Sequence, residues 1–228
     1  MRRARGTADA LLAACWEHPG VPDRLTPAYR FVTAVTVPAV RWWGRLEVEG
    51  LDALPESGPV LLAGNHDSYW DPIAIGIAAT RRRQIHALAK ASMWKYPVVA
   101  QVLTGMGQIP IMRGAGDTGA MDRAEQELRA GKCIGIFPEG TRSQGRELRA
   151  RGGFGRLAQA VPEAAIVCVA VTGTVEIPKL SLRRPRVRVR FFTPSGGGLQ
   201  AGETPAELGA RLLAEIRAEA PVAKAGWT

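Results

Sequence analysis

Cysteine and histidine are scarce in this chain, which has three of each among 228 residues. The cysteines, Cys15, Cys133 and Cys168, lie far apart and form no Cys-x-x-Cys pair. An odd, dispersed set argues against a disulfide framework and against a zinc site, and it favours a reducing compartment. Because nothing in this inventory resembles a set of metal ligands, we expect neither a metal nor a redox cofactor.

Long apolar runs are also absent. No stretch of about 18 uncharged apolar residues occurs, so we expect no membrane-spanning helix. The residues around Cys15 resemble a bacterial lipoprotein cleavage box, but only a few apolar residues precede it, and a signal-peptide core needs roughly 7–15. We therefore interpret this segment as a short amphipathic helix that is capped by Thr7 and ends near Pro19.

Acidic side chains are outnumbered by lysine and arginine, 21 to 30, which gives a formal net charge of +9. Only five of the basic residues are lysines, so the charge comes chiefly from arginine. A hydrophobic fraction of 46% is ordinary for a globular protein and argues against a disordered chain. The charge favours anionic partners, among them phospholipid headgroups, phosphorylated metabolites, coenzyme A and nucleic acid, without choosing among them.

Short apolar runs alternate with helical patterns from residue 45 onward. We expect helices at 73–79, after Asp117 and after a capping box at Thr204, and strands at 46–48, 59–63, 84–89, 108–112, 132–137, 165–171 and 186–191. Strands that alternate with helices predict a single α/β domain with a mixed, largely parallel sheet flanked by helices. We expect this domain to span residues 45–228 and a helical segment to occupy residues 1–44.

The apolar stretch 28–43 follows Thr26 and Pro27, a pair typical of a helix start. Paired tryptophans and arginines lie at its far end, and Pro38 should kink or end the helix. An apolar body flanked by such residues is typical of a segment in a membrane interface. A helix packed on the domain explains the pattern equally well.

A histidine and an aspartate follow the predicted strand 59–63. His66 lies just beyond the carboxyl end of that strand, where α/β sheets place ligands, and Asp71 comes five residues later. In a loop that runs into a helix at Pro72, the two side chains can converge, with Asp71 in an extended, cap-like conformation. The carboxylate would then bond one imidazole nitrogen and leave the other as a base. The alternative is a plain helix cap and a structural loop histidine.

Two further predicted strands end in charged side chains. The segment 137–143, FPEGTRS, presents Glu139 and Arg142, and the strand 108–112 is followed by Arg113. The fork of an arginine suits a phosphate, and turn amides can add donors. Taken alone, Glu139 and Arg142 would more simply form a surface ion pair.

Taken in their order along the chain, these three stretches resemble the motifs of the 1-acyl-glycerol-3-phosphate acyltransferase family. Its first motif, NHxxxxD, matches Asn65, His66 and Asp71; its second matches the strand ending in Arg113; and its third matches FPEGTRS without a mismatch. A fourth element, a hydrophobic strand, fits residues 166–171 but lacks the usual proline, so we assign no binding role there. The resemblance covers roughly residues 45–175.

The resemblance implies a peripheral or monotopic enzyme on the cytoplasmic face of the membrane, docked through its N-terminal segment. His66 would be the general base, oriented by Asp71, and the acyl group would pass from acyl-coenzyme A or acyl carrier protein to a lysophospholipid hydroxyl without an acyl-enzyme. The acceptor's phosphate and glycerol would be bound by residues of the second and third motifs: Arg113, Glu139, Gly140, Thr141 and Arg142. Separately from the resemblance, the hydrophobicity of residues 93–106 suggests that they line an apolar groove that would admit acyl chains.

Other interpretations remain open at this level. The acceptor could be glycerol 3-phosphate or another lyso-lipid, because the motif does not discriminate them. A non-catalytic basic protein that binds membranes or nucleic acid is the alternative of a different class; no nucleic-acid-binding module is present, so we expect no nucleic-acid partner. Ser68 lacks the GxSxG context of a hydrolase nucleophile. The arginine clusters at 81–83 and 183–190 are explained as solvated faces or as sites for anionic headgroups.

Overall fold

The computed structural model describes residues 24–112, 116–179 and 184–223. A seven-stranded sheet forms its centre, in the order β1-β7-β6-β2-β5-β3-β4. The strands are β1 (Glu47–Glu49), β2 (Val60–Gly64), β3 (His86–Lys90), β4 (Ile109–Ile111), β5 (Cys133–Ile136), β6 (Ala165–Thr172) and β7 (Arg188–Phe192). Each lies within two residues of a predicted strand. The short helix expected near Thr7 lies outside the described residues.

The sheet is mixed and largely parallel, as predicted. β6, β2, β5, β3 and β4 pair in parallel, whereas β7 pairs antiparallel with β6 and parallel with β1. The carboxyl ends of five neighbouring strands therefore meet at one edge of the sheet, which is where open α/β sheets bind ligands.

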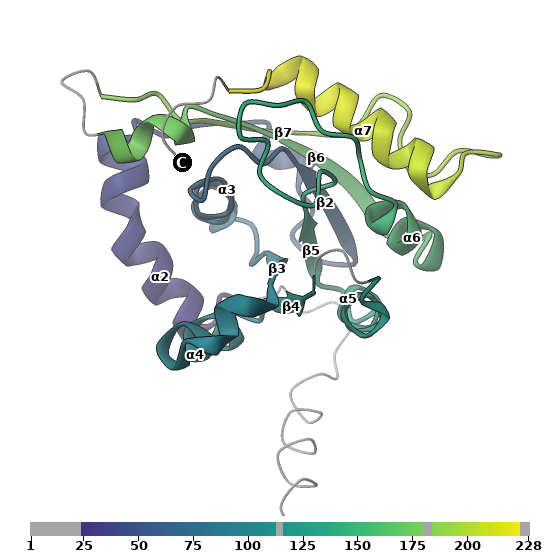
Figure 1. Cartoon of the computed structure of the whole chain (residues 1–228), viewed down its shortest axis with the longest axis horizontal. Coiled ribbons are helices and arrows are strands. Elements are labelled where there is room, and N and C mark those ends of the chain that lie inside the picture. Colours follow the sequence, from purple (N-terminus) through teal and green to yellow (C-terminus); the bar gives the residue numbers. More distant parts are fainter. Residues whose placement is uncertain (1–23, 113–115, 180–183, 224–228) are drawn as a thin grey trace, which may run out of the picture.

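Helices cover both faces of the sheet (Figure 1). On one face lie α2 (Pro27–Val37) and α3 (Asp71–Ala79), and on the other lie α5 (Thr118–Arg129), α6 (Gly153–Ala160) and α7 (Pro205–Glu219). The helix α4 (Pro97–Gly105) packs beside α2. Short 3₁₀ helices η2 (Leu51–Ala53), η3 (Ala91–Lys95) and η4 (Thr174–Lys179) join these elements.

Two hydrophobic cores follow from the alternation of side chains along the strands. Val60 and Leu62 face α3, whereas Leu61 and Ala63 face α5, α6 and α7. All five residues of β2 are buried, as expected for a central strand covered on both faces. The central strands thus hold the loops at their carboxyl ends in a fixed frame.

Side-chain caps set the starts of three helices, as their sequences predict. Thr26 accepts from the main chain of Tyr29, Asp117 from that of Ala120, and Thr204 forms a capping box with Glu207. Gly155 allows α6 to approach α7, because a Cβ there would lie 2.0 Å from the carbonyl oxygen of Pro205.

Pro38 ends α2, as its position predicts. The chain continues as a π-helical stretch, η1 (Pro38–Trp43), because proline donates no main-chain hydrogen bond to an α-helical turn. The α2 helix packs on the domain, with Tyr29 buried and its hydroxyl 3.3 Å from the carbonyl oxygen of Gly76. None of the helices in the described parts of the chain has the length and apolar character needed to cross a bilayer.

The arginine clusters are less solvated than the sequence suggests. Arg83 is only 1% exposed, and its guanidinium donates to the carbonyl oxygens of Pro55, Gly58 and Gly131, so the interpretation of 81–83 as a solvated or headgroup-binding cluster is wrong for this residue. In the alternating strand, the valines 187 and 189 are buried, while Arg188 and Arg190 pair with Glu49 and Glu219.

Candidate active site

The carboxyl ends of β2, β5 and β6 bring the candidate residues together. β2 runs into Asn65 and His66, β5 runs into the turn that contains Glu139, and β6 runs into Thr174. Because β5 and β6 flank β2 in parallel, the three loops leave the same edge of the sheet side by side. Residues more than 70 positions apart in the chain therefore meet.

His66 and Asp71 are in contact, as their spacing predicts. His66 Nδ1 lies 3.2 Å from Asp71 Oδ2. The same carboxylate oxygen accepts from the main-chain amides of Asp67 and Ser68 at 2.6 Å each, and Oδ1 accepts from the hydroxyl of Thr174. A carboxylate at Nδ1 favours the tautomer with the proton on Nδ1, which leaves a lone pair on Nε2.

Asp71 differs in one respect from the expectation. α3 begins at Asp71 itself, after Trp70, so the aspartate is helical rather than extended. Its carboxylate points back into the preceding loop and binds the amides of Asp67 and Ser68 there. The tight loop therefore fixes the same carboxylate that orients the imidazole.

The third motif holds the main chain of His66. The main-chain amide of His66 donates to Glu139 Oε2 at 2.7 Å, and the carbonyl oxygen of His66 accepts from the amide of Ser143 at 2.7 Å. The ring of Phe137 stacks on the imidazole, with centroids 4.2 Å apart. His66 is 6% exposed, so burial and these contacts together limit its motion.

Asn65 extends the pairing of β2 with β6. Its side-chain amide donates to the carbonyl oxygen of Val171 and accepts from the amide of Val171, both at 2.8 Å. The side chain thus replaces a peptide group at the end of the strand pair. The loop that carries His66 begins from this anchored position.

Sequence reasoning missed Arg217, which reaches the site from the last turn of α7. Its guanidinium binds Asp67 in a bidentate pair, with both N–O distances 2.9 Å, and it also donates to Glu139 Oε1. The side chains of Asp67 and Glu139 are 7% and 0% exposed. An arginine near the end of an amphipathic helix carries no local signal of such a role, since it also suits the helix dipole.

The two carboxyl groups that share Arg217 differ in pKa. Burial opposes ionisation of Asp67, but hydrogen bonds from Arg217 and Ser143 outweigh it, so the pKa of Asp67 lies below its usual value. Burial raises the pKa of Glu139, and its bonds with Arg217 and with the His66 amide offset this only in part. Despite its own burial, Arg217 has a raised pKa because both carboxylates accept from it.

The remaining predicted binding residues lie around this centre. Arg142 stacks on the ring of Tyr69, 3.7 Å from its centroid, and donates to the tyrosine hydroxyl at 2.9 Å. Thr141 is exposed. Gly140 has a φ of +70°, and a Cβ there would meet the side chain of Arg151, so this turn requires glycine. Arg113 lies outside the described residues.

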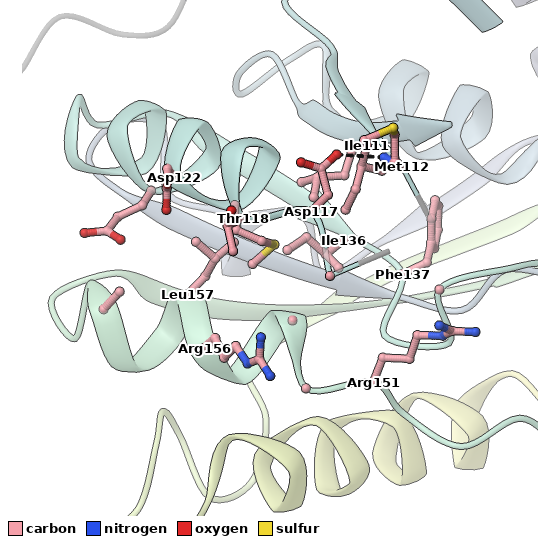
Figure 2. A pocket seen from close by; sticks show the side chains of 18 residues that line it. Ile111, Met112, Asp117, Thr118, Asp122, Ile136, Phe137, Arg151, Arg156 and Leu157 are labelled. Carbon is pink, nitrogen blue, oxygen red and sulfur yellow. Dashed lines mark hydrogen bonds between the residues drawn. The ribbon is translucent and has the colours of Figure 1, made fainter. Parts of the chain in front are cut away.

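A cavity of about 560 Å³ adjoins the site. Phe137, which stacks on His66, is part of its wall. Figure 2 shows Arg151 and Arg156 across the cavity from Ile111 and Asp117. Its apolar lining comes from β3, α5, α6, and β4 and β5 with the residue that follows each: Leu88, Ile111, Met112, Met121, Ile136, Phe137, Leu157 and Ala160. The stretch 93–106 does not contribute to this wall.

Other nucleophiles have structural surroundings. The hydroxyl of Ser68 lies 3.2 Å from the amide of Trp70 and 3.5 Å from the carbonyl oxygen of Thr174, rather than on the imidazole. Burial raises the pKa of the Cys168 thiol to about 12. Within residues 24–112, 116–179 and 184–223, no three His, Cys, Asp or Glu side chains form a group able to hold a metal ion.

Comparison with known proteins gives matches in both sequence and structure. Residues 45–172 match the family described as Acyltransferase. The 1-acyl-sn-glycerol-3-phosphate acyltransferase of Borreliella burgdorferi is 35% identical over 107 residues, which are 46% of this chain and 42% of that protein. The lyso-ornithine lipid O-acyltransferase of Pseudomonas aeruginosa is 32% identical over 143 residues, 59% of this chain and 53% of the relative.

The chain thus spans about half, or less, of the length of these curated relatives. The fold resembles the crystal structure of the 1-acyl-sn-glycerophosphate acyltransferase PlsC from Thermotoga maritima, with a TM-score of 0.62 and 18% identity. That likeness covers 87% of this chain and 81% of the other.

Proposed function

The chain belongs to the Acyltransferase family, and we propose that it transfers a fatty acyl group from a thioester to the free hydroxyl of 1-acyl-glycerol 3-phosphate, giving phosphatidic acid. The observation that carries the proposal is the contact of His66 Nδ1 with Asp71 at the carboxyl edge of the sheet. This contact favours a lone pair on Nε2, the arrangement that a general base requires.

The proposed reaction is a direct transfer. Nε2 of His66 accepts the proton of the acceptor hydroxyl as its oxygen attacks the thioester carbonyl. The carbon–sulfur bond then breaks, and the imidazolium returns the proton to the leaving thiolate, so an ester and a free thiol are formed. Asp71 stabilises the transient imidazolium. Acid–base catalysis of this kind contributes about 10²–10⁴-fold, and positioning of the two substrates must supply more.

The acceptor's phosphate is proposed to bind Arg142, with Arg113 from the second motif and Gly140 and Thr141 from the turn. Arg142 lies on the exposed ring of Tyr69. Because Tyr69 lies between His66 and Asp71 in sequence, this contact supports a cation next to the base. The oxygens of Glu139 are bonded to His66 and Arg217, so we propose that Glu139 shapes this pocket from below without contacting glycerol.

The acyl chain is proposed to enter the cavity behind Phe137. Its aliphatic and thioether lining suits a hydrocarbon chain, and Phe137 contacts both the cavity and the imidazole. A chain held there would present its thioester next to His66. Three acids and two arginines lie on the cavity wall, and of these charged side chains Arg151 and Arg156 are the ones suited to bind a phosphate group of acyl-coenzyme A or acyl carrier protein.

We also propose that the enzyme docks on the cytoplasmic face of the membrane, where such thioesters are found, through residues 1–44. Phe31, Val35 and Trp42 on α2 and η1 are each more than 60% exposed. The neighbouring α4 adds Val98, which is 73% exposed. Apolar side chains on two packed helices support an interfacial surface beside the catalytic domain 45–228.

A second acceptor class is favoured by one relative, whose name gives a lyso-ornithine lipid as its acceptor. The same chemistry would then act on a different lyso-lipid. The test is an assay of the purified chain with 1-acyl-glycerol 3-phosphate, glycerol 3-phosphate and lyso-ornithine lipid, each with acyl-coenzyme A and with acyl carrier protein, in vesicles and in detergent. We expect a mass increase of one acyl group, formed about 10²–10⁴-fold more slowly with His66→Ala. If no acceptor gains an acyl group, the proposed function is wrong.

A further inference from the structure

We propose that Arg217, on the C-terminal helix α7 and outside the matched family region, is a positioning residue that holds the general base in place through Asp67 and Glu139. This inference rests on the proposed function, because it gives Arg217 a part in that reaction. It is carried by a closed set of hydrogen bonds that links α7 to the loops after β2 and β5.

The guanidinium of Arg217 has no donor left for a substrate. Its Nη1 donates to Asp67 and to the carbonyl oxygen of Ala220, Nη2 donates to Asp67 and Glu139, and Nε donates to Glu139. These contacts use all five N–H groups of the side chain. Arg217 is also absent from the walls of the cavity. It therefore acts on the reaction through other residues.

The two carboxylates pass this constraint to the base. Glu139 uses Oε1 for Arg217 and Oε2 for the main-chain amide of His66. Asp67 uses both oxygens for Arg217, and it also accepts from the hydroxyl of Ser143. The amide of Ser143 donates to the carbonyl oxygen of His66. Both peptide groups of His66 are thus tied to atoms that depend on Arg217.

Both the charge and the planar shape of the Arg217 guanidinium are needed at this position. Asp67, Asp71 and Glu139 are buried, and Arg217 is the cation that contacts two of them. Without it, two buried carboxylates would face each other with less compensation, which favours rearrangement of the loops or protonation. A lysine keeps the charge but cannot bind two carboxylates through a planar fork.

The test compares Arg217→Lys and Arg217→Ala with a matched control, Arg211→Lys. Arg211 lies on the same helix and binds Glu203 through two nitrogens, away from the site. With wild-type activity established, we expect kcat to fall about 10- to 100-fold in Arg217→Lys and further in Arg217→Ala, because small misplacements of a base are costly. KM for the acceptor should stay within about threefold, since Arg217 binds no substrate, and Arg211→Lys should retain its kcat.

A second measurement does not depend on activity. Hydrogen exchange of the His66 amide in the full chain should be at least about tenfold faster in Arg217→Lys than in wild type. The amide of Ala165, which bonds to Pro59 away from this network, should not change. If wild-type protein transfers no acyl group, the proposed function fails, and exchange alone still tests the positioning.

Three results would overturn the inference. One is an unchanged kcat in folded Arg217→Lys, and another is a rise in KM with kcat retained, which would make Arg217 a substrate ligand. The third is an unchanged exchange rate for the His66 amide. If Arg217→Ala is unfolded by circular dichroism, Arg217→Lys carries the comparison alone.

Discussion

The main-chain amide of His66 donates to the carboxylate of Glu139 at 2.7 Å, so the third motif holds the backbone of the base as well as its ring, on which Phe137 stacks. The ring is left to Asp71 on one edge and to Phe137 on one face. This division of contacts separates the residues that fix the position of the base from the residue that sets its tautomer, and substitutions should affect the two differently.

Replacing His66 by alanine should lower kcat about 10²–10⁴-fold while the acceptor still binds, because the base is lost and the phosphate contacts remain. The measurement is steady-state acyl transfer to 1-acyl-glycerol 3-phosphate. His86→Asn is the control: His86 Nδ1, on β3, bonds to the carbonyl oxygen of Gly107 in the turn after α4, and an asparagine amide can replace that bond. Equal losses in the two variants would argue against His66 as the base.

Replacing Arg142 by alanine should raise KM for phosphate-bearing acceptors about 10- to 100-fold, because a charge-assisted contact is lost. Tyr69 supplies a graded comparison. Tyr69→Phe removes only the hydroxyl that accepts from Arg142 and should change KM about two- to threefold, whereas Tyr69→Ala also removes the stacked ring and should change it more. A KM that stays the same in Arg142→Ala would place the phosphate elsewhere.

The stability conferred by Asp67 should depend on pH. Its pKa is lowered in the folded protein by Arg217 and Ser143 despite burial, so the carboxylate stabilises the fold above its unfolded pKa of about 3.9, and this contribution is lost as pH falls through the folded value. Asp67→Asn should therefore lower the free energy of unfolding by about 1–3 kcal/mol at pH 7 and by less at pH 3.

Urea denaturation at the two pH values measures this difference. Asp52→Asn, a substitution at an exposed residue, provides the baseline. Glu139 titrates in the opposite sense: burial raises its pKa, so it weakens the fold as pH rises from about 4.3 through its folded value, which makes the comparison with wild type at each pH essential. A destabilisation by Asp67→Asn that does not vary with pH would contradict the ionised pair.

Filling the cavity should shorten the preferred acyl chain. Ala160 lies on its wall in α6, and Ala160→Phe would occupy volume that a long chain needs. We expect kcat/KM for a sixteen-carbon donor to fall about tenfold or more relative to an eight-carbon donor. Gln159→Phe, at an exposed position on the same helix, should leave the ratio unchanged. The same ratio in Ala160→Phe and wild type would exclude this cavity as the acyl site.

Local sequence was sufficient to predict most of the sheet and the caps. Residues 166–171 of the predicted strand 165–171 are buried on both faces of the sheet, and apolar runs of that kind have few alternatives. The side-chain caps at Thr204 and Asp117 use hydrogen bonds within three residues, so they could be found without tertiary information. The contact of His66 with Asp71 was predictable only in part: the spacing allows the two side chains to converge in a loop that runs into a helix, and the match to the family motifs favoured this over a plain helix cap.

The features that the sequence did not predict, namely the helix α6 and the contacts of Arg83 and Arg217, depend on tertiary structure. α6 is short, and its buried face is defined by α7, where Gly155 meets Pro205. Arg83 looked like part of a surface cluster, but its three carbonyl acceptors come from two loops far apart in the chain, one with Pro55 and Gly58 and one with Gly131. Arg217 is 78 residues from Glu139, and no periodicity or motif reports a contact across that separation.

The contact of Gly155 with Pro205 limits the substitutions that this chain can tolerate at residue 155. A single added methyl group at residue 155 would overlap the main chain at the start of α7 and force that helix outward. The helix α7 carries Arg217, which neutralises Asp67 and Glu139 behind the imidazole of His66. A shift of α7 would therefore displace the reacting groups, although residue 155 contacts none of them. A substitution of Gly155 is thus expected to abolish activity although the sequence motifs of the site are unchanged.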